Sequence, residues 1–359
     1  MELNKEEKSK LFSIFENIKG DLNKESSSLS TNRTLNSNVL LVDGTNTFFR
    51  CWSANPMMND HGMHVGGVAG FLKSVGYAIK LVNPTRCVIV FDGAGGSLKR
   101  KKLFPEYKEH KHVKIRLNRI YEEDSVLEEE EKNLKKQMFR TVEYLMHLPV
   151  NQLMINQIEA DDTIAYCAVQ CFKEKVVIMS SDKDFLQLVD NRISVWSPTK
   201  KRLYGIPEVL ADYGIHPFNF VLFRAMDGDA SDNIPGIEGA GPKTIIKRFP
   251  FLSENKEHTI KDILDYSKEH VGEYKLYDRV IEQESVLERN YYLMQLKETQ
   301  ISTVAQLHIN DCLNSENRPK LDRYNFVKLI TEDRMWNNIP NYGNWLTEVF
   351  GGLDSLIKG

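Results

Sequence analysis

The stretch Val39-Leu-Leu-Val-Asp43-Gly44 decides the fold, because a continuous apolar run ends there in an aspartate and a glycine. The same pattern occurs at 87–91, which Asp92 follows, and at 176–179, which ends near Asp182. Short uninterrupted apolar runs are typical of strands that are buried on both faces of a parallel sheet. Helical patterns separate these runs, so the sequence predicts an α/β fold with a central, mainly parallel sheet and flanking helices.

The expected helices follow from apolar residues at helical spacing. They lie at about 65–82, 126–147, 159–173, 206–213, 217–227 and 241–248, with longer helices at about 259–300 and 321–333. A short amphipathic helix is also expected at 4–19. The Ser- and Asn-rich stretch that follows it, up to residue 38, is typical of a linker.

The composition is that of an ordinary globular chain of 359 residues, 41% of them hydrophobic, with 47 Lys and Arg against 50 Asp and Glu. No stretch approaches the roughly 18 uninterrupted apolar residues that a membrane-spanning helix needs. The first residues lack the apolar core of a secretory signal. The five cysteines are scattered and odd in number, which favours free thiols in a cytoplasmic protein and argues against a structural zinc site.

Three aspartates stand at the carboxyl ends of the predicted strands, where ligands bind in an open parallel sheet. Asp43, Asp92 and Asp182 each follow an apolar run. Any one of them alone is explained as well by turn formation or by helix N-capping, because Asp is common in both roles. Their occurrence at one edge of the sheet favours a shared site.

Further acidic residues come in short groups: Glu159, Asp161, Asp162, Asp184, Asp229 and Asp232. Three acids within the four residues 159–162 repel one another unless a cation neutralises them. All nine side chains offer oxygen ligands without a His or Cys, and such ligands select Mg²⁺ or Mn²⁺. Two ions about 3.5–4 Å apart form the clamp used for displacement at phosphorus. The pattern therefore predicts metal-dependent phosphodiester hydrolysis.

A glycine-rich turn follows the last acidic pair and leads into a basic helix. Its glycines and the polar residues after them are Gly236, Gly239, Gly241, Lys243, Thr244 and Lys247. Free amides at a helix N-terminus bind phosphate, although a turn of this kind is more often a plain connector. Its position between an acidic pair and basic residues favours a phosphate contact.

A second basic segment, 97–119, contains nine Lys and Arg with Phe104 and Tyr107 among them. Interleaved cations and aromatic rings suit a single nucleic-acid strand, because bases stack on the rings and cations follow the phosphates. A solvated surface loop is the alternative, since most charge runs are solvated. The acidic run 122–131 beside it is either a solvated helix face or a limit on where DNA runs.

These motifs together resemble the flap endonuclease and 5′-3′ exonuclease family. The matching segments are Asp43-Gly-Thr-Asn, Phe91-Asp92-Gly, Arg100 to Lys108, Glu159-Ala-Asp-Asp, Ser181-Asp-Lys-Asp184 and Gly228-Asp-Ala-Ser-Asp232-Asn-Ile-Pro-Gly236. The similarity covers about residues 39–250. Within the family, the run 180–201 is especially similar to the ribonuclease H branch of T-even bacteriophages.

The resemblance implies a PIN-like 5′ nuclease fold with a helical arch and a helix-hairpin-helix element. It implies two Mg²⁺ ions, which Mn²⁺ can replace, one among residues matching Asp43, Asp92, Glu159, Asp161 and Asp162. The other lies among residues matching Asp182, Asp184, Asp229 and Asp232. Arg100 and Lys108 match cations at the base of the arch that hold the scissile phosphate. DNA contacts are expected from Arg50, Lys99, Tyr107 and Lys111, and from the glycine-rich turn, which grips duplex backbone and can hold K⁺.

The resemblance also divides the chain into four parts. They are an N-terminal helix and linker (1–38), a catalytic nuclease domain (39–205, with the arch at about 97–140), a helix-hairpin-helix region (206–255) and a helical C-terminal region (256–359). The implied substrates are DNA and RNA–DNA hybrids with 5′ flaps, nicks or forks. The implied activity removes RNA primers and adjacent DNA from 5′ ends during replication, in the host cytoplasm if the protein is viral.

Two other interpretations stay open at this point. One is a branched-DNA binding protein of the same fold without catalysis, although nine filled acidic positions argue against it. The other is a PIN-like endoribonuclease, which explains the acids but leaves the glycine-rich turn and the basic segment unused. The N-terminal helix is a candidate tether to a sliding clamp, and the C-terminal region is a candidate contact for a single-strand-binding protein. Packing on the body is the alternative for both.

Overall fold

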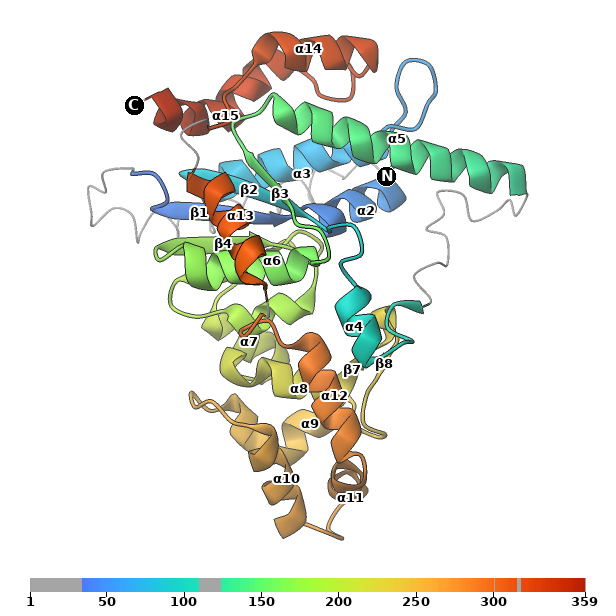
Figure 1. Ribbon diagram of the computed structural model, residues 1–359, viewed down its shortest axis with the longest axis vertical. Helices are drawn as coiled ribbons and strands as arrows, with labels where there is room; N and C mark the ends of the chain where they lie inside the picture. The colour runs from blue at the N-terminus through green and yellow to red at the C-terminus, as the bar shows by residue number, and fades with distance from the viewer. Residues whose placement is uncertain (1–33, 110–123, 300, 315–317, 359) are drawn as a thin grey trace, which may run out of the picture.

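The computed structural model describes residues 34–109, 124–299, 301–314 and 318–358. The helix expected at 4–19 and Lys111 lie outside these residues. A six-stranded sheet crosses the middle of the molecule in the order β3-β2-β1-β4-β5-β6 (Figure 1). Its strands are β1 (Asn38–Asp43), β2 (Arg86–Phe91), β3 (Asn151–Met154), β4 (Lys175–Met179), β5 (Ile193–Ser197) and β6 (Arg202–Tyr204). All neighbouring strands are parallel except β5 and β6.

The register brings the ends of the three central strands level. Val42 of β1 pairs with Ile89 of β2 on one side and with Met179 of β4 on the other. The three predicted apolar runs are therefore neighbouring strands, with β1 between β2 and β4. Their carboxyl ends meet at one edge of the sheet, as expected from the sequence. The strands β3, β5 and β6 were not predicted, because they are short and lack an uninterrupted apolar run.

Each face of the sheet is covered by a separate group of helices. The upper face in Figure 1 carries α2 (Gly44–Ala54), α3 (Gly66–Val82), α5 (Asp124–Met146), α14 (Arg323–Glu332) and α15 (Tyr342–Lys358). The lower face carries α6 (Ala160–Tyr166), α7 (Ile206–Tyr213), α8 (Phe220–Asp227), α9 (Pro242–Arg248), α10 (Ile260–Glu269), α11 (Lys275–Glu282), α12 (Glu284–Met294) and α13 (Thr303–Asn314). Successive side chains of β1 point to opposite faces of the sheet, so Leu41 packs into the lower core and Leu40 into the upper one.

Most of the predicted helices are present, including those expected at 241–248 and 321–333 (α9 and α14), and the spans 159–173 and 259–300 differ from the prediction. The helices expected at 65–82, 126–147 and 206–213 are α3, α5 and α7. The helix expected at 159–173 ends its α-helical part at Tyr166 and continues as a π-helical turn, Cys167–Cys171. The span 259–300 forms three helices rather than a continuous one, since Gly272 has a positive φ of 78° between α10 and α11.

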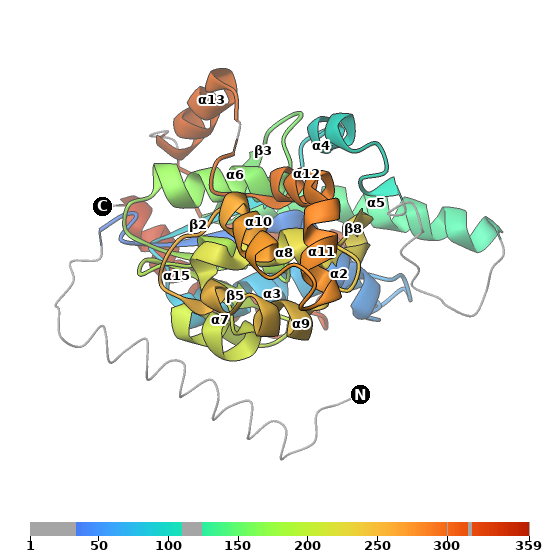
Figure 2. The same ribbon diagram turned by 90° about the horizontal axis from the view of Figure 1, so that it is seen from below.

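The C-terminal residues are divided between the two faces of the sheet. Helices α10 to α13 pack into the lower core, and α14 and α15 pack into the upper one. Figure 2 shows α8, α10 and α12 grouped beneath the sheet. The four-part division of the chain stays a prediction. Among the described residues, none of the helices combines the length and the apolar composition that crossing a membrane requires.

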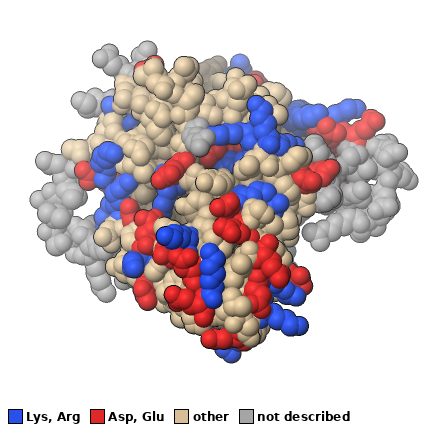
Figure 3. Space-filling view, turned by 60° about the horizontal axis from the view of Figure 1, so that its bottom comes forward, with Lys and Arg blue, Asp and Glu red and all other residues tan. Residues whose placement is uncertain are grey.

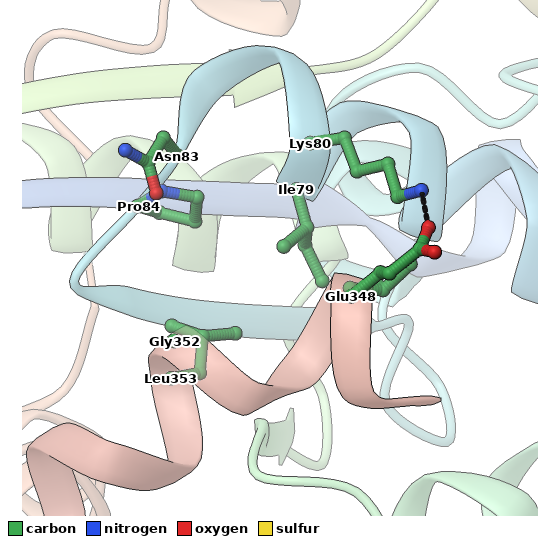
Figure 4. A pocket seen from close by; sticks show the side chains of 8 residues that line it. Ile79, Lys80, Asn83, Pro84, Glu348, Gly352 and Leu353 are labelled. Carbon is green, nitrogen blue, oxygen red and sulfur yellow. Dashed lines mark hydrogen bonds and ion pairs between the residues drawn. The ribbon is translucent and has the colours of Figure 1, made fainter. Parts of the chain in front are cut away.

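A pocket of about 340 Å³ lies between the end of α3 and α15 (Figure 4). Lys80 and Glu348 form an ion pair of 2.6 Å at its rim, and Pro84 lines it just before β2 begins. It is therefore at the amino end of β2, whereas Asp92 follows the carboxyl end of the same strand. This pocket is separate from the acidic residues that the sequence singles out.

Candidate metal centre and active site

The candidate site begins at the last residue of β1. Asp43 caps α2 by accepting a hydrogen bond from the Asn46 amide at 2.9 Å, and it accepts a second from the Ser180 hydroxyl at 2.9 Å. Its side chain is buried, and burial raises its pKa to about 7, with the neighbouring charges of Asp92 and Asp161 raising it further against the hydrogen bonds. Asp43 is therefore a helix N-cap, which was the alternative explanation for a single aspartate, and it is also a member of an acidic cluster.

The next strand and the start of α6 supply four more carboxylates. Asp92 follows β2 and accepts a hydrogen bond of 2.7 Å from the Ala160 amide, which fixes it against the first turn of α6. Carboxylate oxygens of Glu159, Asp161 and Asp162 all lie within 4.8 Å of one another. Burial, followed by the charge of Asp161, raises the pKa of Asp162 to about 7. These residues form the first carboxylate group together with Asp43.

The second carboxylate group lies on two tight turns. The short 3₁₀ helix η3 (Lys183–Leu188) begins at Asp182, whose side chain accepts a hydrogen bond of 2.8 Å from the Asp184 amide. Burial and the charge of Asp184 raise the pKa of Asp182, and the more distant charges of Asp161 and Asp43 add to this effect. The two carboxylate groups are therefore electrostatic neighbours.

The remaining two acids sit on a small hairpin formed by β7 (Gly228–Asp229), the turn η5 (Ala230–Asp232) and β8 (Ile234–Pro235). Asp229 accepts hydrogen bonds from the Ser231 amide at 2.7 Å and from its hydroxyl at 2.6 Å. Against the effect of partial burial, Ser231 and Arg224 lower the pKa of Asp229. Asp184 and Asp229 are linked, because the Arg224 guanidinium contacts each of them at 2.6 Å.

Two cations from the segment after β2 reach the carboxylates. Arg100 on α4 (Leu98–Leu103) contacts Glu159 and makes a two-pronged ion pair with Asp162 at 2.8 and 3.0 Å. Lys108 contacts Glu159 and lies 3.9 Å from Asp232, so it spans both carboxylate groups. Although burial opposes it, the charges of Glu159, Asp161 and Asp232 raise the pKa of Lys108, which keeps the amine protonated.

In the part of the chain that the structure describes, the carboxylates of the site outnumber the cations that form ion pairs with them. Within the described residues, ion pairs to the nine candidate carboxylates come from Arg100, Lys108 and Arg224, and Asp43, Asp92 and Asp182 form none. Residues of both carboxylate groups have raised pKa values, because burial and like charges disfavour ionisation. The donors are all carboxylate oxygens, several of them partly exposed, and this set fits hard divalent cations.

The residues predicted to contact DNA have different surroundings. Lys99 is exposed, and Arg50 donates a hydrogen bond of 2.9 Å to the Ser74 hydroxyl. The Tyr107 ring is 2% exposed and packs on Ile234, Leu293 and Met294 in this structure, and its contact with DNA stays a prediction. Its hydroxyl donates toward Glu159 and Asp232, at 3.2 and 3.3 Å. Tyr107 is therefore a buried partner of the acids.

The glycine-rich turn has the backbone features that glycine permits. A Cβ on Gly236 would lie 2.3 Å from the Asp227 carbonyl oxygen, and Gly239 has a φ of +83°. Gly241 precedes α9, and Lys243 and Lys247 on that helix are exposed, whereas Thr244 is half-buried. Among the described residues on the face seen in Figure 3, acidic and basic side chains are intermingled.

Sequence reasoning missed Arg224. Its side chain is 4% exposed, and it contacts Asp184 and Asp229 together with Asp227 at 3.4 Å. A signal was present, because Arg224 stands within the apolar run Phe220–Met226, and an arginine is seldom buried unless it is paired. The identity of its partners depended on the tertiary fold.

The fold and the acidic edge define a PIN-like 5′ nuclease. Residues 38–214 match the family model described as 5′-3′ exonuclease, N-terminal resolvase-like domain. The 5′-3′ exonuclease of Aquifex aeolicus is 32% identical over 211 residues, covering 58% of this chain and 67% of that protein. That of Buchnera aphidicola from Acyrthosiphon pisum is 32% identical over 239 residues, covering 65% and 77%. The chain belongs to the 5′-3′ exonuclease family.

Larger proteins and solved structures extend the comparison. DNA polymerase I of Bacillus subtilis is 31% identical over 217 residues, but the chain spans only 23% of that protein. The flap endonuclease of bacteriophage T5, in a structure with DNA and metal ions, aligns with a TM-score of 0.57 at 22% identity, covering 83% of this chain and 99% of that one. The structural likeness supports the fold. The special similarity to T-even ribonuclease H stays a prediction.

Proposed function

We propose that this protein is a metal-dependent, structure-specific 5′-3′ exonuclease and flap endonuclease that hydrolyses phosphodiester bonds. The observation that carries this proposal is the convergence of nine carboxylates from five segments, faced within the described residues by three ion-paired cations. A protein that only bound DNA would gain affinity by losing this negative charge, because the backbone of DNA is itself negative.

Two Mg²⁺ ions, with Mn²⁺ as a substitute, are the proposed cofactors. Asp43, Asp92, Glu159, Asp161 and Asp162 would hold the first, and the second would lie among Asp182, Asp184, Asp229 and Asp232. When bound, such ions stabilise charge on the phosphate and lower the pKa of an attacking water. The partial exposure of the second set, with side chains about one-fifth exposed at Asp184 and Asp232, leaves room for a strand terminus to reach it.

Arg100 and Lys108 are the proposed cations for the scissile phosphate. Both come from the segment that follows β2, and both contact Glu159 of the first carboxylate group. Preorganised cations aimed at developing charge stabilise it strongly in a site that is largely shielded from water. Their contacts with Glu159 support this role, because Glu159 is a proposed ligand of the first ion.

The proposed substrates are DNA and RNA–DNA hybrids with 5′ flaps, nicks or forks, including RNA primers, whose removal would be a ribonuclease H activity in replication. The exposed glycines Gly239 and Gly241 and the exposed lysines of α9 support a backbone grip on duplex DNA, and the turn's carbonyls would hold K⁺. A sliding clamp and a single-strand-binding protein are proposed partners, and the cytoplasm, of the host for a viral protein, is the proposed location.

A Mg²⁺ titration on three 5′-labelled substrates tests the proposal: a nicked duplex, a flapped duplex and a duplex that carries an RNA primer. Short labelled products that require both Mg²⁺ and a 5′ end support it. Tight binding to the flap without cleavage at any Mg²⁺ or Mn²⁺ concentration would establish the non-catalytic interpretation. Cleavage of single-stranded RNA without dependence on a 5′ end would establish the endoribonuclease.

A further inference from the structure

Helix α12 lies beyond residues 38–214, the part that matches the family model, yet it touches the elements that carry the second carboxylate group. It packs along α8, which leads into the β7–β8 hairpin, and it also contacts α4 at the base of the arch. In Figure 1, α12 runs beside α4 and the β7–β8 hairpin. Three contacts explain how it could support the site.

Asn290 makes the first contact. Its side chain is fully buried, and its amide nitrogen donates hydrogen bonds to the Ala225 carbonyl at 2.9 Å and to the Pro235 carbonyl at 2.8 Å. The Ala225 carbonyl lies before the hairpin that bears Asp229 and Asp232, and the Pro235 carbonyl belongs to its last residue. A single side chain on α12 therefore joins the two ends of the hairpin and fixes them to the helix.

Gln187 makes the second contact, from the opposite direction. It lies in η3, is 1% exposed, and donates hydrogen bonds to the Asp184 carbonyl at 2.8 Å and to the Met294 carbonyl at 2.9 Å. Its side-chain oxygen accepts a third bond, of 2.9 Å, from the Leu296 amide. The turn that presents Asp184 is thereby attached to the end of α12.

Arg100 makes the third contact. Its Nε donates a hydrogen bond of 2.9 Å to the Leu293 carbonyl, while its other nitrogens face Glu159 and Asp162. The last carbonyls of a helix have no partner within it, and the negative end of the helix dipole favours a cation. Nearby, the Arg289 guanidinium lies 4.3 Å from the centre of the Phe104 ring.

We propose that α12 is a support that fixes the second carboxylate group relative to the base of the arch, with Asn290 and Gln187 as positioning residues. This inference rests on the proposed function, because the carboxylates it concerns are the proposed ligands of the second ion. Neither side chain touches an acidic side chain. They act by holding the backbone of the two turns, and ligand geometry sets the affinity of a metal site.

The test replaces each amide by an apolar side chain of similar size, Asn290→Leu and Gln187→Met, so that the charge of the site is unchanged. Mn²⁺ binding is measured by calorimetry on the full chain. The wild type is expected to bind two ions, and each variant is expected to bind the second ion about 10-fold more weakly while the first keeps its affinity, since lost outer contacts typically cost 10–100-fold. At a fixed low Mn²⁺ concentration, each variant should have a lower kcat, with a smaller change in KM. At high Mn²⁺ concentration the kcat should return toward the wild-type value.

Two controls separate positioning from general destabilisation. Glu288→Gln changes an exposed residue of the same helix and should leave both isotherm steps and cleavage unchanged. Ile263→Val trims a fully buried residue of α10 and should lower the melting temperature without altering Mn²⁺ binding. Loss of affinity in Ile263→Val equal to that in Asn290→Leu would overturn the proposal.

Amide hydrogen exchange in EDTA makes the test independent of activity. Asn290→Leu should speed exchange at residues 228–235, and Gln187→Met at 183–188, relative to Glu288→Gln. Wild-type exchange and wild-type Mn²⁺ affinity in both variants would refute the support role of α12. A wild-type protein that binds no divalent ion would instead refute the proposed function, and the exchange data would still decide whether α12 holds the turns.

Discussion

Replacement of Arg224 by methionine should make the stability of the protein depend on divalent ions. Arg224 is the buried cation between Asp184 and Asp229, with contacts of 2.6 Å to each, and it also donates to the Gly228 carbonyl at 2.8 Å. Methionine fills much of the same volume but leaves the two carboxylates facing each other without a counter-charge. The substitution should therefore destabilise the metal-free protein more than the metal-bound protein.

The magnitude follows from the burial of the groups. Removing one partner of a buried ion pair costs about 3–5 kcal/mol, because the remaining charge is left uncompensated. Asp184 and Asp229 are about one-fifth exposed, so water and proton uptake recover part of this cost. We expect a loss near the lower limit, about 3 kcal/mol in EDTA. For a chain of this length that is a fall of about 4 °C in melting temperature.

Thermal unfolding in EDTA and in saturating Mg²⁺ measures the effect. A divalent ion at the second carboxylate group supplies the missing charge, and ligands that bind only the folded state stabilise it. The difference in melting temperature between Arg224→Met and the wild type should therefore become clearly smaller when Mg²⁺ is added.

A matched control is Arg192→Met, which removes an arginine that donates to the Ala168 and Phe172 carbonyls at 2.8 and 2.9 Å, with its nearest carboxylate, that of Asp190, 3.9 Å away. Its deficit should be equal with and without Mg²⁺. The reasoning fails if Arg224→Met melts like the wild type in EDTA, or if Mg²⁺ affects the two variants equally.

Four further outcomes are expected. Asp161→Asn should abolish cleavage while DNA binding survives, which a gel-shift assay beside a cleavage assay will show. Lys108→Ala should lower turnover by about 10²-fold, the typical effect of losing one preorganised charge donor, and single-turnover kinetics at wild-type speed would remove Lys108 from the site. Gly239→Val should weaken duplex binding because its φ of +83° strains a branched residue, whereas Gly241→Ala, with open space around it, should not. In EDTA the melting temperature should fall as pH rises from 5 to 8: burial raises the pKa of Asp43 to about 7 from an ordinary 3.8, so between those values the folded state binds more protons than the unfolded state. Asp43→Asn should flatten that dependence.

The edge of the sheet could be predicted because it depends on local pattern alone. An apolar run followed by an aspartate fixes both the strand and the place where it ends, and Asp43 and Asp92 lie where this rule put them. The acids of 159–162 were found for a similar reason, since a helix start can be recognised from its first turn. The sequence could not show which cations would meet them, because those contacts join distant segments.

The burial of Tyr107 could not be predicted for the same physical reason. Tyr107 stands among charged residues in the sequence, but Leu293 and Met294, nearly 190 positions later, cover its ring. The proposed role of α12 could not be found in the sequence, because Asn290 donates its hydrogen bonds to the Ala225 and Pro235 backbone carbonyls, and such contacts leave no sequence pattern. Local spacing predicts elements and ligand types, whereas burial and counter-charges arise only when the chain is folded.

The two sets of cations in the site differ in how they are anchored, and this difference bears on function. Arg224 belongs to the body, on a helix buried beneath the sheet, and serves the second carboxylate group. Lys108 belongs to the segment that follows α4 and contacts Glu159 in the first group. A divalent ion bound at Glu159 would compete with Lys108 for the same carboxylate, since both neutralise it. If Lys108 holds the substrate phosphate as proposed, metal binding at Glu159 would release the Lys108 amine for that contact, so that the ion and the phosphate would favour each other's binding.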